Sequence, residues 1–213
     1  VGSEMCIRDS DGTIFAASSI AYNSQTGLMR VYKKVSITTS GTANTGNGIT
    51  VSISSLPHAL AIGDVIKFSN GAKLTLTSNA SASATSLTGN LTTQNLTSGL
   101  EGNTWTQIGS DITGSSTYNN FGASLSINGD GTIVAVGVTQ DNQGGSYSGA
   151  VNVYQYSSNS WSQVGSYVSG ASNEYFGENV SINNDGTIFV ASSSSPNSNT
   201  GLARVYQSSS AQK

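Results

Sequence analysis

An internal repeat of about 55 residues constrains this chain more than any other feature of its sequence. Phe121 and Phe176 occupy equivalent places in two long copies and are 55 residues apart. A third, partial copy opens the chain, because the segment S-D-G-T-I-F at residues 10–15 returns as N-D-G-T-I-F at 184–189. A period of this length indicates one supersecondary unit that buries its apolar surface by stacking on its neighbours.

A complete copy contains four segments that read as strands. In the middle copy, apolar residues alternate along Ala123–Ile127, and the turn N-G-D-G follows at Asn128–Gly131. Thr132–Val138 is almost continuously apolar, which is typical of a strand covered on both faces. Ala150–Tyr156 and the W-S-Q-V segment from Trp161 alternate again. Four antiparallel strands that need cover on both faces predict a blade of a β-propeller.

The residues that recur in these blades resemble the FG-GAP family. The resemblance is carried by Phe121-Gly122 and Phe176-Gly177, the N-G-D-G and N-N-D-G turns, the A-V-G segment Ala135–Gly137 and the G-A-V-x-V-Y strand. FG-GAP repeats build the head of integrin α-subunits and occur in many bacterial and algal surface proteins. The resemblance implies a propeller, an extracellular or cell-surface location, and a role in adhesion or binding.

The set of blades is expected to be incomplete, with one complete and two partial blades. Residues 1–9 fit no repeat and resemble a translated adapter tail, so that Cys6 is interpreted as a terminal free thiol. The repeats are assigned to 10–34 (strands 2 and 3 of a first blade), 104–112 (the last strand of that blade), 113–168 (a complete blade) and 169–213 (a blade lacking its last strand). Unpaired strand edges in such a fragment predict edge-to-edge self-association.

An insert separates the last two strands of the first blade and covers residues 35–103. Ile49–Ile53 alternates cleanly, and Asn70-Gly71 lies between two apolar-rich segments, which predicts a β-hairpin. A further short strand is expected over Ser86–Leu91. The insert is interpreted as a small β-module that decorates the propeller, with a dedicated binding domain as the alternative.

Charge and composition argue against several classes of function. The net charge is −3 and only 9% of residues are charged, so the chain offers no basic surface for nucleic acid. No apolar run reaches the length of a membrane-spanning helix. The chain has one His, His58, and its carboxylates Glu174 and Glu178 flank a Phe-Gly pair and share no predicted site. We therefore expect no enzymatic activity.

Calcium is the one cofactor that the resemblance suggests. FG-GAP blades often carry an acidic loop whose oxygens surround Ca²⁺. The first Asp of that motif is replaced here by Ser126 and Ser181, and its closing Asp is absent. A plain hairpin turn is therefore favoured over a calcium site, for which the candidates are Asn128, Asp130, Asn183, Asp185 and, in a separate loop, Asp141.

Four aromatic residues could stack on sugar rings, although their regular recurrence favours packing between blades: Trp105, Trp161, Tyr118 and Tyr175. The leading interpretation is a non-catalytic surface propeller that binds a protein or a glycan. One alternative is a structural repeat of a large surface or virion protein. A second alternative is a fragment of a propeller-class enzyme that acts on polysaccharide.

Overall fold

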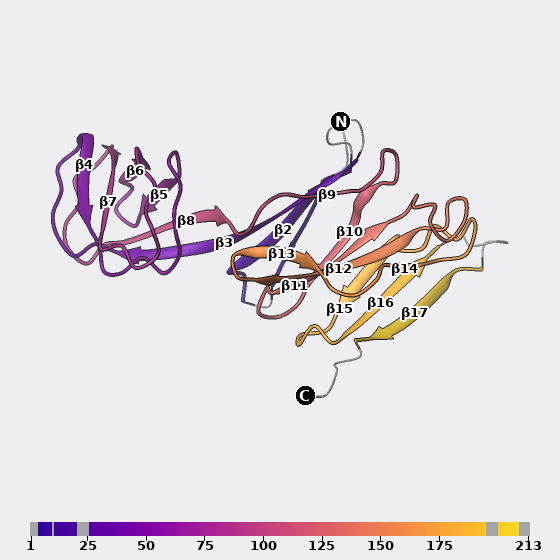
Figure 1. The fold of residues 1–213 in the computed structure, drawn as a ribbon. Coiled ribbons are helices and arrows are strands. Elements are labelled where there is room, and N and C mark those ends of the chain that lie inside the picture. Colours follow the sequence, from indigo (N-terminus) through magenta and orange to yellow (C-terminus); the bar gives the residue numbers. More distant parts are fainter. Residues whose placement is uncertain (1–3, 10, 21–25, 195–199, 209–213) are drawn as a thin grey trace. The chain divides into compact units, whose positions relative to one another are not determined.

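The sheets of the described residues are antiparallel and no helix occurs among these residues, as expected for the all-β fold that the sequence predicted. The computed structural model describes residues 4–9, 11–20, 26–194 and 200–208, with side chains from residue 7 onward. Every regular element in these residues is a strand (Figure 1). The chain divides into two compact units, one formed by Val1–Tyr32 with Gln107–Lys213 and the other by Lys33–Thr106. This second unit begins two residues before and ends three residues after the insert expected from the sequence.

The first unit contains three sheets, which we name the first, second and third repeat. The first repeat consists of β1 (Glu4–Arg8), β2 (Ile14–Ser19), the beginning of β3 (Leu28–Thr38) and β9 (Ile112–Thr113). The second consists of β10 (Phe121–Ile127), β11 (Ile133–Val138), β12 (Ala150–Ser157), β13 (Ser160–Gln163) and β14 (Val168–Ser169). The third consists of β15 (Asn179–Ile182), β16 (Ile188–Ser193) and β17 (Leu202–Gln207).

One element of the first repeat differs from the prediction. The sequence placed residues 1–9 outside the repeats and left the first copy without an opening strand, but Glu4–Arg8 forms β1 and pairs with β2 along its length. An antiparallel ladder needs only backbone donors and acceptors, so an extended segment of any composition can satisfy the edge of β2. The side chain of Cys6 lies outside the described residues.

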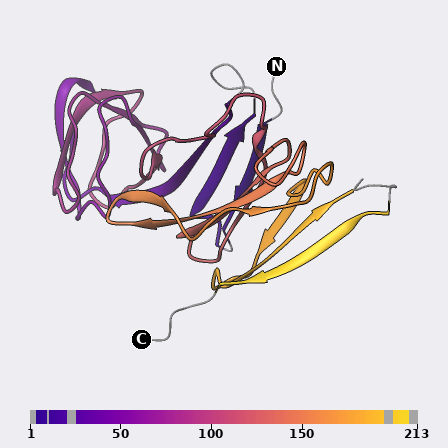
Figure 2. The same cartoon turned by 45° about the vertical axis from the view of Figure 1, so that its right-hand side comes forward.

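The three sheets of the first unit stack on one another in chain order (Figure 2). One apolar core lies between the first and second repeats, and a second core lies between the second and third. Strand β11 contributes to both cores, because Val134 and Val136 belong to the first and Ala135 belongs to the second. All three side chains are fully buried, which confirms the prediction of a strand covered on both faces.

The second unit is a separate small β-fold around its own core. Its strands are the end of β3, β8 (Glu101–Gln107), β5 (Val65–Phe68), β6 (Lys73–Leu76), β7 (Ser86–Thr92) and β4 (Gly46–Ser52), in this order across the sheet. Strands β5 and β6 form the hairpin predicted at Asn70-Gly71. The last residue of β3 also bonds to the backbone after β4, since Ser54 N donates to Thr38 O at 2.8 Å. These pairings enclose a core of Leu, Ile, Val and Phe side chains.

Candidate functional site

The residues considered as calcium ligands hold the hairpin turns of the repeats together. In the second repeat, the Asn128 side-chain oxygen accepts a hydrogen bond from Ile133 N at 2.8 Å. The Asp130 carboxylate accepts from Thr132 N at 3.0 Å and from the Thr132 hydroxyl at 2.6 Å. The Thr132 hydroxyl is the main cause that lowers the pKa of Asp130. These oxygens are thus engaged by the turn that they close.

The third repeat builds the same turn with the same contacts. Asn183 accepts from Ile188 N at 2.9 Å, and Asp185 accepts from the backbone N and the hydroxyl of Thr187 at 3.0 and 2.6 Å. The Thr187 hydroxyl is likewise the main cause that lowers the pKa of Asp185. Four of the five calcium candidates therefore close the same type of hairpin turn, the two asparagines by one contact and the two aspartates by another.

The first repeat also contains this turn, and the sequence analysis, which matched residues 10–15 with 184–189, missed only the part that Asp9 plays in it. Asp9 accepts from Ile14 N at 3.0 Å, and Asp11 accepts from the backbone N and the hydroxyl of Thr13 at 2.9 and 2.6 Å. Asp9 thus takes the place of Asn128, although it belongs to the segment that the sequence analysis set aside as a tail. The signal was available in the spacing, because an Asp or Asn precedes each D-G-T-I segment by two residues.

Asp141 lies in the loop between β11 and β12. Its side chain is buried and accepts a hydrogen bond from Gln143 N at 2.9 Å, while its backbone oxygen accepts from the Ser148 hydroxyl at 2.9 Å. Within the described part of the chain, no group of three or more His, Cys, Asp or Glu side chains could hold a metal ion.

The paired glutamates and the tryptophans are engaged in separate contacts. Glu174 binds Arg204 through two hydrogen bonds of 2.8 Å, and this pairing is the main cause that lowers the pKa of Glu174. Glu178 instead accepts from Ser194 N at 2.5 Å. Trp161 donates to Ile108 O at 2.9 Å and packs on the core between the first and second repeats. Trp105 belongs to the second unit.

A groove at one end of the first unit gathers exposed tyrosines and uncharged polar side chains. It has a volume of about 390 Å³ and is lined by Thr117, Tyr118, Gln140, Asn142, Ser146 and Tyr147. These residues come from the loop before β10 and the loop between β11 and β12. Tyr118 is 64% exposed and Tyr147 is 44% exposed. We call this feature the tyrosine groove.

The tyrosine groove continues into the third repeat through an aromatic stack. The rings of Tyr147 and Tyr175 are 5.5 Å apart between centroids and inclined by 22°. Backbone bonds fix the two loops to each other, since Tyr175 N donates to Tyr147 O at 3.0 Å and Asn173 N donates to Ser146 O at 2.7 Å. Tyr147 N also donates to the side-chain oxygen of Asn142 at 2.7 Å. These backbone and side-chain contacts therefore fix the positions of the aromatic faces.

All three tyrosines have left-handed backbone conformations, which bulky side chains rarely adopt. Their φ angles are 61° at Tyr118, 51° at Tyr147 and 51° at Tyr175. The equivalent positions in the neighbouring repeat carry Asn: Asn173 corresponds to Tyr118, and Asn120 corresponds to Tyr175, with φ of 60° and 57°. Asn suits this conformation better than Tyr does. At Tyr118 and Tyr175 the chain therefore carries a bulky side chain where the neighbouring repeat carries the better suited Asn.

The sequence analysis named two of the aromatic residues at this groove, while it favoured packing between blades for them. It named Tyr118 and Tyr175 as candidates for sugar stacking, and both belong to the groove or to its aromatic stack. It missed Tyr147, whose loop has no counterpart of equal length in the other copies. The other two aromatic candidates, Trp105 and Trp161, do not line the groove.

A scan of protein-family models and a search of curated proteins found no match to this chain. Among the described residues, no helix is long and apolar enough to cross a bilayer.

Proposed function

We propose that this chain is a non-catalytic propeller-type repeat region, similar to FG-GAP repeats, that binds a neutral glycan through the tyrosine groove. Two features support the propeller assignment: the sheets repeat at about 55 residues, and they stack face to face with β11 buried on both sides. An extracellular or cell-surface location rests on the FG-GAP resemblance.

The observation that carries the proposal is the combination of exposed rings and uncharged polar groups in one groove. The C–H faces of a sugar ring pack on an aromatic face, and its hydroxyls require donors and acceptors around the rim. Tyr118 and Tyr147 provide such faces, while Gln140 and Asn142 provide amide groups. None of the described residues that line the groove is Asp, Glu, Lys or Arg, which favours a neutral glycan over a charged one.

Titration of the full chain with neutral glycans selected on an array tests this proposal. Replacing Tyr118 by Asn, the residue at the equivalent position of the third repeat, removes the most exposed ring and suits the local backbone. We expect Tyr118→Asn to weaken binding about tenfold, as expected for the loss of one stacking contact, with an unchanged melting temperature.

Tyr167→Asn is the matched control, because Tyr167 is 37% exposed but does not line the groove. This variant is expected to bind as the wild type does. The proposal fails if the wild type binds no neutral glycan, or if Tyr118→Asn and Tyr167→Asn weaken binding equally.

A further inference from the structure

The contact between the first and second repeats combines a buried hydrogen bond with a close approach of a glycine to an isoleucine. The Ser18 hydroxyl donates to the backbone oxygen of Gly122 at 2.7 Å, and both groups are buried. Gly122 follows Phe121 in a β-bulge and has φ of 86°. In the hairpin turn that follows β10, Gly131 lies over Ile14 so closely that an added Cβ would be 2.2 Å from Ile14 Cδ1. The first repeat thus contacts two glycines of the second repeat, and a side chain at Gly131 would overlap Ile14.

The contact between the second and third repeats follows the same design. Gly177, which follows Phe176, accepts a hydrogen bond of 2.7 Å from the Ser124 hydroxyl. Gly137 replaces Ser18 at the equivalent position, and Ser124 lies directly opposite Gly137 in the sheet, so the donor has moved to the adjacent strand. Gly186 lies over Ile133, with 2.4 Å between an added Cβ and Ile133 Cδ1.

The third repeat presents the equivalent residues on its outer face, where several of them are exposed. We define the third-repeat face as Ile188, Val190, Ser192, Ala203 and Val205. Ile188, Val190 and Val205 are 39%, 37% and 71% exposed. Their counterparts in the first repeat are Ile14, Ala16 and Val31, which are 4%, 0% and 1% exposed. Ser192 corresponds to Ser18.

We propose that the third-repeat face is a docking surface for a further repeat of the same type. Ser192 donates to the glycine carbonyl that follows the phenylalanine of the incoming repeat, and Ile188 packs beneath the glycine of its hairpin turn. This occupant follows from continuity with two contacts of the same design within the molecule. A face-to-face contact of this kind is distinct from pairing at the free edge of a strand.

The incoming repeat can be supplied in the register that the chain itself uses. Gln155 and Gln207 are equivalent, because they pair with Ile133 and Ile188 at the same place in their sheets. Residues 1–207 followed directly by a copy of residues 156–213 therefore form an extended chain with one more Phe-Gly strand in the natural spacing.

The experiment compares Val205→Lys in the original and the extended chain. In the original chain, Val205 is largely exposed, and we expect the melting temperature to change by about 1 °C or less. In the extended chain, the added repeat buries residue 205, and the same substitution is expected to lower the melting temperature by about 5–10 °C. Ile62→Lys is the matched control, because Ile62 is 64% exposed in the second unit. It should be neutral in both chains.

A second measurement keeps the proposal testable if the extended chain melts in more than one step. Thiol labelling of Val205→Cys, followed at residue 205 by mass spectrometry, is expected to be at least tenfold slower in the extended chain. Equal labelling rates in both chains overturn the proposal. Labelling that slows with concentration in the original chain, with no effect of the extension, also overturns it, because a second copy then covers the face.

Discussion

The inner face of the first repeat and the outer face of the third repeat occupy the same positions of one repeating sequence, yet one is buried and the other is exposed. Val31 and Val205 are the same residue type in equivalent strands, with exposures of 1% and 71%. The local sequence decides which face of the strand a side chain occupies, since strands β3 and β17 alternate in the same phase. The neighbouring repeat decides whether that face is covered.

The largest expected effect comes from placing a charge at these two equivalent positions. Val31→Lys buries an unpaired ammonium group between the first and second repeats and should destabilise the first unit by about 3–5 kcal/mol. Val205→Lys should change stability by about 0.5 kcal/mol or less. Urea unfolding followed by tryptophan fluorescence of Trp161 measures both. Similar losses in the two variants would contradict the burial difference.

A smaller effect is expected at the turn glycines, where two positions share a backbone conformation but differ in their neighbours. Gly12 and Gly131 have φ of 73° and 72°. An added Cβ at Gly12 meets no atom of the described residues within 4 Å, whereas at Gly131 it lies 3.0 Å from Ile14 Cβ in addition to its overlap with Ile14 Cδ1. Gly12→Ala should therefore cost about 1 kcal/mol for the backbone alone.

Gly131→Ala should cost about 1–3 kcal/mol more than Gly12→Ala, because Ile14 must move within a packed core. Thermal unfolding of the two variants provides the comparison. Equal losses would mean that the first and second repeats do not pack as closely as this contact indicates.

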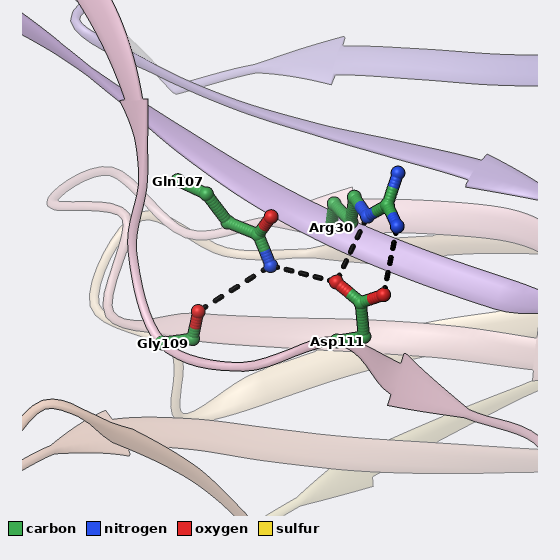
Figure 3. A network of polar contacts seen from close by, with 4 residues as sticks. All are labelled: Arg30, Gln107, Gly109 and Asp111. Carbon is green, nitrogen blue, oxygen red and sulfur yellow. Dashed lines mark hydrogen bonds and ion pairs between the residues drawn. The ribbon is translucent and has the colours of Figure 1, made fainter. Parts of the chain in front are cut away.

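The smallest expected effect concerns the arginines that occupy equivalent positions in β3 and β17. Arg30 binds Asp111 through two hydrogen bonds of 2.8 Å, and Gln107 donates to the same carboxylate at 2.8 Å (Figure 3). The hydrogen bond from Arg30 is the main cause that lowers the pKa of Asp111 to about 2. Arg204 instead pairs with Glu174.

A carboxylate whose pKa is lowered in the folded state stabilises the protein at pH values above its ordinary pKa. This stabilisation is lost as the pH falls through the pKa of the folded state. The Asp111 contribution should therefore be complete above about pH 4 and disappear as the pH falls to about 2. Because its side chain is 35% exposed, we expect Asp111→Asn to cost only about 1 kcal/mol or less at pH 7. A wild-type-minus-variant difference that persists unchanged at pH 2 would contradict this assignment.

Much of the fold could be predicted from the sequence because strands and turns leave local signals. The alternation along Ala123–Ile127 and the Asn70-Gly71 turn each depend on a few neighbouring residues. Strand β1 could not be predicted in this way, since it lacks the Phe-Gly pair and is defined by backbone pairing with β2. Val31 is buried in a core that includes Phe121, which lies 90 residues further along the chain. The unequal burial of Val31 and Val205 therefore depends on long-range packing, which no local sequence pattern shows.

The tyrosine groove was only partly predictable for a different reason. Tyr118 and Tyr175 could be recognised as aromatic candidates, but their left-handed backbone and their convergence with Tyr147 arise from the three-dimensional path of three loops. Alignment of the two copies does hold one clue. At the positions that precede Phe121 and Phe176 by one and by three residues, Tyr and Asn are exchanged between the copies.

The pairing of strands on either side of the insert has a consequence for how such a chain can change over time. In the first unit, Ile108 N donates to Val31 O at 2.9 Å, and in the second unit the side chains of Ser36 and Asn103 are joined at 2.7 Å. The polypeptide therefore returns to the strand that it left, as it does in the second repeat after the short turn between Tyr156 and Trp161. Since closing a loop costs little more when the loop is long, the repeat tolerates a folded module where its neighbour has a turn. Between β3 and β8, one inserted module can therefore replace another while the strand pairing of the first repeat stays intact.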